Sequence, residues 1–171
     1  MKSLFQSMKN IVILLIAVMS ISSLLSCGPY SFSGSALKGL DTISVPLFEN
    51  ETTQYGIRED LTDQLTEALV QDNTLKVVNV RRADSVIRGV VKKYVNECYT
   101  YDASGSCDEY ISRVYVDVTF EDMKHKEVLW EEKNIEGYGI YSANGETEDD
   151  GMERAIEKLS ANIIDKIIKG W

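Results

Sequence analysis

The strictest pattern in this 171-residue chain is an alternation of apolar and polar side chains over residues 113–120. Apolar side chains occupy every second position, at Val114, Val116, Val118 and Phe120. Successive side chains of a strand point to opposite faces of its sheet, so a period of two predicts a strand that is buried on one face. Any fold of this chain therefore has to cover one face of a sheet.

Two helices are predicted to provide that cover, one before the strand and one after it. In residues 56–72 and 148–169, apolar side chains recur every three or four positions and form one stripe, as in a helix that lies on a sheet. Thr147 can cap the second helix, and Asn73 suits the left-handed residue that ends the first. The stripes consist of Ile57, Leu61, Leu65 and Leu69 in the first helix, and of Met152, Ile156, Leu159, Ile163 and Ile167 in the second.

Further strands are predicted from alternation and short apolar runs. Pro46 has no backbone N–H to donate, which predicts an edge or a bulge in the first of them. Lys92 and Lys93 break the alternation in the third, which predicts a bulge. The order β-α-β-β-β-β-α predicts an α+β domain with two helices packed on one face of a four- to five-stranded mixed sheet, its first two strands parallel. These strands are expected at residues 41–49, 75–80, 85–98 and 128–141.

The N-terminal segment has the layout of a bacterial secretory signal peptide. Lys2 and Lys9 lead into an apolar run of fifteen residues, 11–25, and Ser26 then precedes Cys27. A helix of that length reaches only ~22 Å, which is short of the ~30 Å hydrocarbon core of a bilayer. Leu-Leu-Ser-Cys resembles a lipobox, in which the leader is cleaved before a cysteine that becomes fatty-acylated, for example with palmitate.

We therefore expect residues 1–26 to be a cleaved lipoprotein signal peptide and Cys27 to carry a lipid anchor in the membrane. Residues 27–40 are expected to form an acylated tether, and residues 41–171 a single α+β domain. Several acyl chains hold a protein on a membrane far more firmly than one. The alternative is an ordinary secreted protein in which Cys27 occupies this position by chance.

The charge of the chain restricts its partners. Cleavage of the leader would remove two lysines and no acidic residue, and would lower the net charge from −9 to −11. Such a domain as a whole repels nucleic acid and anionic membrane surfaces, so no nucleic-acid partner is expected and an anionic ligand needs a local basic patch. The first candidates are Lys124, His125 and Lys126 in a predicted turn, and the second are Lys92 and Lys93. The alternative is that all five are ordinary solvated residues.

Two further cysteines, Cys98 and Cys107, bracket a segment that is predicted to be a loop and contains Tyr and Gly. The compartment outside the cytoplasm permits disulfides, so we expect a bridge that contributes somewhat less than ~3 kcal/mol. Two free thiols are the alternative, because this spacing by itself is a weak signal.

The sequence contains no Gly-rich phosphate loop, no nucleophile elbow and no Cys-x-x-Cys pair. His125 is the one histidine, and it has no sequence neighbour with the spacing of a metal site or a catalytic triad. The acidic runs at residues 59–63 and 146–150 are typical of solvent-facing helix surfaces and lack the spacing of a calcium loop. We therefore expect no enzymatic activity, no metal and no cofactor.

Four stretches of the chain resemble the LptE family of lipopolysaccharide-assembly lipoproteins. Their order and spacing carry the resemblance, which covers nearly all of the chain after Cys27. The stretches are residues 27–34, residues 45–50 with the helix at 61–65, Ala83-Asp84 leading to Arg88-Gly89, and Val128-Leu129-Trp130 with Trp171.

The resemblance implies a Gram-negative outer-membrane lipoprotein, held on the periplasmic face, that plugs the LptD β-barrel and supports its assembly. It also implies binding of lipopolysaccharide (LPS) during its transport to the cell surface, and a fold of two helices against a mixed sheet. The outward row of Arg113, Tyr115 and Thr119 would then face a barrel wall, or else form an ordinary solvated sheet face. The segment between Cys98 and Cys107 departs from the family pattern.

Residues 45–50 and the helix that follows them also allow a second interpretation of the family. This unit is also similar to peptidoglycan-synthase activator lipoproteins and to curli-secretion lipoproteins. An outer-membrane lipoprotein adaptor of another class is therefore the alternative function. Residues 84–89 and the strand that contains Trp130 fit the LptE family better.

Overall fold

The computed structural model describes Leu37 and residues 39–169. The expected signal peptide, the acylated Cys27, most of the tether and Trp171 lie outside the described residues. Neither described helix combines the length and the apolar character that spanning a membrane requires. The elements are β1 (Thr42–Ser44), β2 (Glu49–Asn50), α2 (Ile57–Asp72), β3 (Lys76–Val77), the 3-10 turn η1 (Val80–Arg82), β4 (Ser85–Tyr101), β5 (Cys107–Asp122), β6 (Glu127–Ser142) and α3 (Glu148–Lys169).

The strands form one mixed sheet in the order β3-β1-β4-β5-β6, and β2 pairs with β4. The short strands β1, β2 and β3 pair in parallel, whereas β4, β5 and β6 form an antiparallel meander. The pairing of β1 with β3 confirms the parallel strands expected on either side of the first helix. The predicted α+β class is confirmed, with six strands in the described region instead of four or five.

The additional strand arises because the strand predicted at residues 41–49 is interrupted. Pro46 lies in the segment between β1 and β2. In the same segment, Phe48 N donates a hydrogen bond to Thr62 Oγ1 of α2 at 3.1 Å. The Phe48 ring is buried against Gly89, where a Cβ atom would overlap it. The irregularity expected at Pro46 is therefore a break that turns Phe48 into the core.

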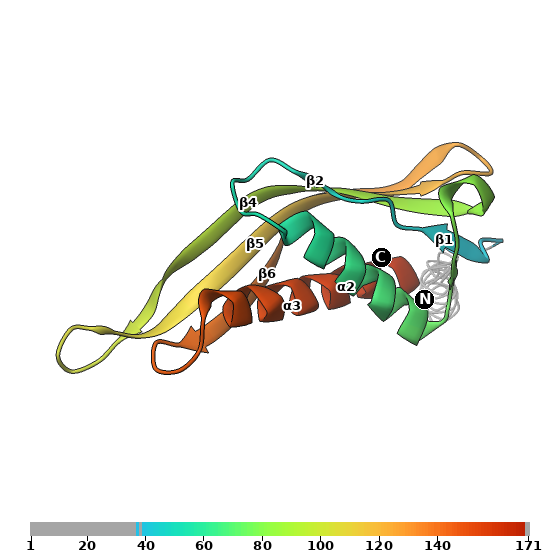
Figure 1. Cartoon of the computed structure of the whole chain (residues 1–171). Coiled ribbons are helices and arrows are strands. Elements are labelled where there is room, and N and C mark those ends of the chain that lie inside the picture. Colours follow the sequence, from blue (N-terminus) through green and yellow to red (C-terminus); the bar gives the residue numbers. More distant parts are fainter. Residues whose placement is uncertain (1–36, 38, 170–171) are drawn as a thin grey trace, which may run out of the picture. The chain divides into compact units, whose positions relative to one another are not determined.

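The helices α2 and α3 pack against each other on one face of the sheet (Figure 1). Both predicted apolar stripes are buried there, which confirms the periodicity argument. Asn73 ends α2 with φ 58°, as expected for a left-handed cap. Thr147 and Asp150 cap α3 reciprocally: Thr147 N donates to Asp150 Oδ2 (2.7 Å), and Asp150 N donates to Thr147 Oγ1 (3.4 Å).

The helix α3 approaches β6 closely because glycines leave room for its backbone. A Cβ atom at Gly137 would overlap the backbone oxygen of Ala155 and would lie 2.6 Å from Leu159 Cβ. At Gly139 it would overlap the backbone oxygen of Gly151. These two positions on β6 fix the depth at which α3 lies on the sheet.

The structure changes the length of three predicted strands. The strand expected at 75–80 is only β3, because the Asn79 side chain accepts a hydrogen bond from Arg81 N (3.1 Å) and starts η1. The strands expected at 85–98 and 113–120 are longer, so residues 99–101 of the loop predicted between Cys98 and Cys107 are strand, whereas residues 102–106 form the turn. The bulge expected at Lys92 and Lys93 is confirmed by a register shift between Val91 and Lys93.

Residues 97–109 of the β4–β5 hairpin, here called the arm, project beyond the first turn of α3 (Figure 1). Cys98 and Cys107 form a disulfide across the arm, with their Cα atoms 5.8 Å apart. At its tip, Asp102 Oδ1 accepts hydrogen bonds from Ser104 N (2.7 Å) and Ser106 N (3.0 Å). The arm is therefore held by short-range bonds instead of by the helices.

Candidate functional site

Lys124, His125 and Lys126 lie in the turn between β5 and β6, as predicted. The turn is built around the buried carboxylate of Asp122 at the end of β5. Asp122 Oδ1 accepts hydrogen bonds from Lys124 N (2.7 Å) and His125 N (2.9 Å), and its Oδ2 lies 2.7 Å from His125 Nδ1. The carboxylate thus folds the chain so that three exposed basic side chains stand at the end of the sheet.

The Lys124 side chain ties this turn to the beginning of the domain. Its Nζ lies 3.0 Å from Asp84 Oδ1 and donates to Gly39 O at 2.7 Å. The Lys124 hydrogen bond, together with those from Asp41 N and the Thr42 side chain, lowers the pKa of Asp84 to about 2. Two of the contacts that Lys124 can make are therefore already used within the domain.

His125 and Lys126 are more open to solvent. The hydrogen bond and the charge of Asp122 raise the pKa of His125, although 70% of its side chain is exposed. Lys126, with φ 57°, is exposed and makes no ion pair within residues 39–169. At this turn, a negatively charged ligand would therefore meet two groups. One is the His125 imidazole, whose positive charge is partly offset by Asp122, and the other is the Lys126 ammonium group, whose charge is not offset by an ion pair.

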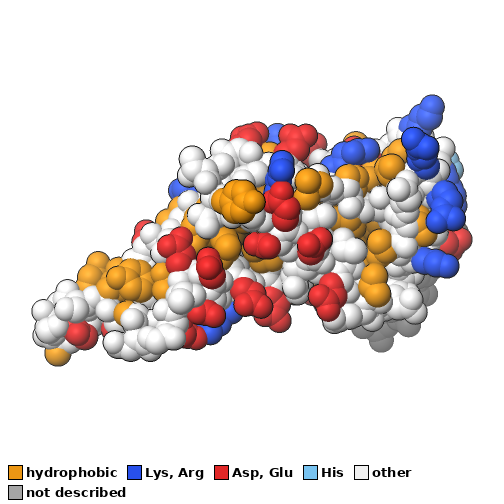
Figure 2. Space-filling model, in the orientation of Figure 1, with side chains coloured by type: hydrophobic (Ala, Val, Ile, Leu, Met, Phe, Trp, Pro, Cys, Tyr) orange, Lys and Arg blue, Asp and Glu red, His pale blue; other side chains and the backbone are white. Residues whose placement is uncertain are grey.

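The structure brings η1 beside this turn, which enlarges the basic surface. Met123 N donates to Asp84 O (2.7 Å), and Thr42 Oγ1 donates to Arg82 O (3.4 Å). Figure 2 shows Lys and Arg side chains gathered at this end of the sheet. We call this surface the basic end; it consists of Lys76, Arg81, Arg82, Lys124, His125 and Lys126.

The sequence predicts the turn but not the other residues of the basic end. Arg81 and Arg82 follow a predicted strand and lie more than forty positions from Lys124 in the sequence. They meet only because β1 pairs with both β3 and β4, and β4 with β5. The adjacent pair of arginines was the one available signal, and its position depended on the topology.

The second candidates, Lys92 and Lys93, lie on another part of the sheet. Lys93 pairs in register with Tyr115, seven positions before Asp122, which corresponds to ~23 Å along β5. Lys92 forms an ion pair with Glu51, and that bond raises the pKa of Lys92. Lys93 Nζ lies 5.7 Å from the centre of the Tyr115 ring. Both lysines are thus bound to neighbours and separate from the basic end.

The row of Arg113, Tyr115 and Thr119 lies on the sheet face that α2 and α3 leave open. Arg113 forms ion pairs with Glu97 and with Glu136, the second at 3.2 Å. Tyr115 OH donates to Glu136 Oε1 (3.1 Å). These contacts join β4, β5 and β6 across the open face and make the centre of that face a network of paired charges.

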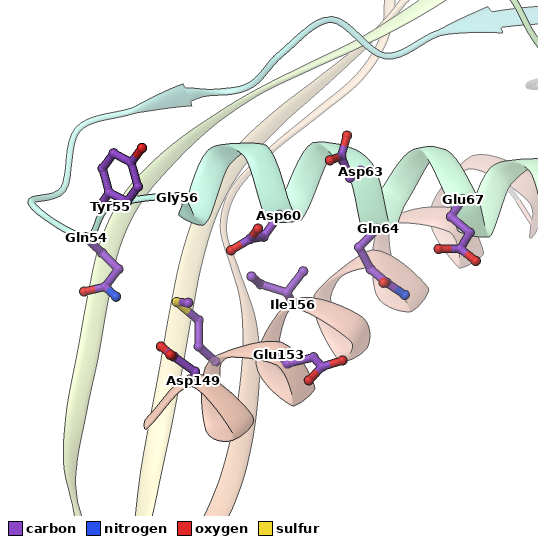
Figure 3. A pocket seen from close by; sticks show the side chains of 11 residues that line it. Gln54, Tyr55, Gly56, Asp60, Asp63, Gln64, Glu67, Asp149, Glu153 and Ile156 are labelled. Carbon is purple, nitrogen blue, oxygen red and sulfur yellow. The ribbon is translucent and has the colours of Figure 1, made fainter. Parts of the chain in front are cut away.

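A groove between α2 and α3 has a volume of about 660 Å³ and is strongly acidic (Figure 3). Its floor includes Met152 and Ile156. Burial, and then the charges of neighbouring carboxylates, raise the pKa of Asp60. An anionic ligand is therefore disfavoured here. The carboxylates that line the groove are Asp60, Asp63, Glu67, Asp149 and Glu153.

The family of the chain follows from a comparison with protein-family models. The model of the family described as LptE, Lipopolysaccharide-assembly, matches residues 40–169. The chain belongs to the LptE family. The match includes every helix and strand described above, and it confirms the resemblance found in the sequence. No curated protein sequence matches this LptE-family chain significantly.

Solved structures share the fold of this LptE-family chain at low identity. A putative lipoprotein from Caulobacter crescentus has a TM-score of 0.53 and 16% identity, covering 78% of this chain and 93% of its own. The hypothetical protein CT253 from Chlamydia trachomatis has a TM-score of 0.53 and 10% identity, covering 75% and 98%. PelC from Paraburkholderia phytofirmans, solved as a dodecamer, has a TM-score of 0.50 and 14% identity, covering 75% and 87%. At these identities, the similarity establishes the fold alone.

The structure of this LptE-family chain also brings His125 near two acidic residues. Ligand-type atoms of Asp122, His125 and Glu127 lie within 4.8 Å of one another, a proximity that the sequence analysis did not expect. Both Asp122 oxygens, however, already take part in hydrogen bonds of the turn. The cluster is therefore explained by the turn itself, and it supports no metal proposal.

Proposed function

We propose that this LptE-family protein is an outer-membrane lipoprotein that plugs the LptD β-barrel and supports its assembly. We further propose that it binds LPS during transport to the cell surface. The observation that carries the proposal is the family match over residues 40–169. The role is binding and scaffolding instead of catalysis.

The proposed anchor is Cys27, acylated after cleavage of residues 1–26, on the periplasmic face of the outer membrane. Residues 28–39, fully extended, span at most about 40 Å, so the domain would stay near the bilayer. Mass spectrometry of the protein purified from membranes tests this. We expect an acylated peptide that begins at Cys27; an intact leader or an unmodified Cys27 thiol contradicts the anchor.

The partner is tested by affinity purification of the acylated protein from membranes, with an untagged strain as the control. We expect one large β-barrel protein to copurify in a stable complex. Recovery of a penicillin-binding protein instead supports the adaptor alternative. So does a homo-oligomeric ring; PelC, which has a similar fold, was solved as a dodecamer.

For LPS, we propose that Lys124, His125 and Lys126 contact its phosphate groups, with Lys92 and Lys93 as the second candidates. In support, the turn lies beside Arg81 and Arg82, away from the acidic groove. The combined Lys124→Glu and Lys126→Glu variant should bind LPS more weakly, whereas unchanged binding removes this site. Because Lys124 pairs with Asp84, thermal unfolding of the variant must be measured as well.

The matched control reverses the same number of charges at the second candidates, as Lys92→Glu with Lys93→Glu. If the turn is the LPS site, this control binds LPS as the unchanged protein does. If only the control loses binding, the site lies on the open face of the sheet near Tyr115.

A further inference from the structure

We propose that the basic end docks on the anionic phospholipid surface of the bilayer to which the tether leads. The proposal rests on the proposed function for the tether and the Cys27 anchor. It adds a second, electrostatic contact between the folded domain and the membrane, made by the β5–β6 turn together with Lys76, Arg81 and Arg82, which the LPS proposal does not use.

The place where the tether joins the domain supports this orientation. Leu40 is buried and its N–H donates to Leu37 O at 3.0 Å. The carbonyl of Gly39, between them, accepts the hydrogen bond from Lys124 Nζ. The chain therefore enters the domain beside the β5–β6 turn, so a short tether would hold the basic end nearest to the membrane.

The charges that face outward at this end are mainly positive. Lys76, Arg81, Arg82 and Lys126 are exposed and make no ion pair within residues 39–169. Of the carboxylates at this end, Asp84 and Asp122 are turned inward and bound to Lys124 and His125. Asp41 and Glu127 are exposed and offset part of the positive charge. Four exposed cations against two exposed carboxylates leave a net attraction for an anionic surface.

The negative charge of the arm does not reverse this attraction, because the arm is too distant. The arm begins where β5 begins, and β5 runs from Cys107 to Asp122, ~50 Å in an extended strand. The Debye length at physiological ionic strength is ~8 Å. The carboxylates of the arm are therefore screened from a surface in contact with the basic end.

Two features match the basic end to phosphate groups at a bilayer surface. Guanidinium groups such as those of Arg81 and Arg82 bind phosphate oxygens in a bidentate geometry. Val80 and Met123, which are 39% and 38% exposed, stand next to these basic residues in η1 and in the turn. Apolar side chains among cations can enter the boundary between headgroups and acyl chains.

The test uses the chain from residue 27 onward with Cys27→Ser, which removes the acylation site, and vesicles of phosphatidylcholine with or without phosphatidylglycerol. We expect binding only with phosphatidylglycerol and a loss of binding as salt increases. Each basic residue near an anionic surface contributes about fivefold. Arg81→Glu with Arg82→Glu should therefore weaken binding by about 25-fold or more, with no change in thermal unfolding.

The matched control is Lys133→Glu with Lys158→Glu, which changes the net charge equally but lies outside the basic end. It should bind vesicles as the unchanged chain does. Equal binding with and without phosphatidylglycerol, or equal losses in both variants, overturns the proposal. Binding of LPS micelles without binding of phosphatidylglycerol vesicles also overturns it and leaves the proposed function intact. Unchanged LPS binding by Lys124→Glu with Lys126→Glu contradicts only the proposed LPS site.

Discussion

The sheet beneath the helices and the arm belong to one hairpin of β4 and β5, yet different forces stabilise them. Beneath the helices, Val114, Val116 and Val118 of β5 are almost completely buried. In the arm, residues 97–109, side chains on both faces are exposed or half-buried. Burial of apolar area, at about 25 cal/mol per Å², can therefore stabilise the first region and contributes little to the second.

Short-range bonds replace burial in the arm. The Cys98–Cys107 disulfide joins its strands, Asp102 orders its tip, and Thr100 Oγ1 donates to Glu109 Oε2 at 3.1 Å. Where the two regions meet, the rings of Tyr110 and Tyr141 stack with their centres 5.4 Å apart. The comparison teaches that changes beneath the helices should affect global stability, whereas changes in the arm should affect local order.

The largest contrast is expected between two glycines. Gly137→Val places a side chain into the backbone of α3, which cannot retreat, so we expect a loss of more than about 4 kcal/mol or failure to fold. Gly105→Ala, at the tip of the arm, meets no atom within 4 Å and incurs only the ~1–2 kcal/mol strain of its φ of 83°. Chemical denaturation of both variants measures the contrast. Equal losses would show that the arm is part of the global folding unit.

A smaller contrast compares truncation of a core and an arm side chain. Leu65 of α2 is fully buried, and Leu65→Ala should cost about 3 kcal/mol through lost contacts and a residual cavity. Tyr101 of the arm is 68% exposed, and Tyr101→Ala should change the free energy of unfolding by less than ~0.5 kcal/mol. Urea denaturation distinguishes them. If Tyr101→Ala lowered the free energy of unfolding by a comparable amount, the Tyr101 side chain would have to be packed in the arm, which contradicts the comparison.

The same difference explains how much of the fold follows from the sequence. A helix that is buried on one side has a periodic pattern of apolar residues in its sequence. For this reason α3 matches its predicted bounds, and α2 differs from its predicted bounds by one residue. The arm has no such pattern of apolar residues, because neither of its faces is buried. Gly105 and its serine neighbours indicate a loop, while Tyr99, Thr100 and Tyr101 favour a strand. Cross-strand pairing decides in favour of strand for residues 99–101, and this pairing is not visible in a one-dimensional pattern.

The candidate site divides in the same way. The turn at Lys124, His125 and Lys126 is local, so its sequence predicts its position. The contribution of Arg81 and Arg82 depends on which strands pair, and it becomes visible only when β1 and β4 are side by side. The partner of Lys124, Asp84, is equally distant in sequence, so neither the ion pair nor the low pKa of Asp84 is predictable without the topology.

The next prediction concerns the disulfide. Replacing both cysteines, Cys98→Ser with Cys107→Ser, should lower the free energy of unfolding by somewhat less than ~3 kcal/mol, because the closed loop is short. Amide hydrogen exchange should accelerate in residues 97–109 and stay unchanged in α3. Alkylation of both thiols in the protein isolated without reductant would show that the bridge does not form. Faster exchange throughout α3 would contradict the separation of the two regions.

The smallest expected effect is a pH dependence of the melting temperature. It compares Asp84, in the sheet region, with Asp102, in the arm. Asp84 has its pKa lowered to about 2, first by Lys124, whereas an unfolded aspartate titrates near ~3.9. Its carboxylate therefore stabilises the fold fully above ~3.9, and that contribution is lost as the pH falls towards 2. In Asp84→Asn, the melting temperature should be lower at neutral pH and approach that of the unchanged protein in acid.

Asp102→Asn in the arm keeps an oxygen acceptor for Ser104 N and Ser106 N, so its global melting temperature should follow the unchanged protein throughout. Thermal unfolding followed by circular dichroism across this pH range measures both, and a constant offset for Asp84→Asn would assign its role to packing instead of charge.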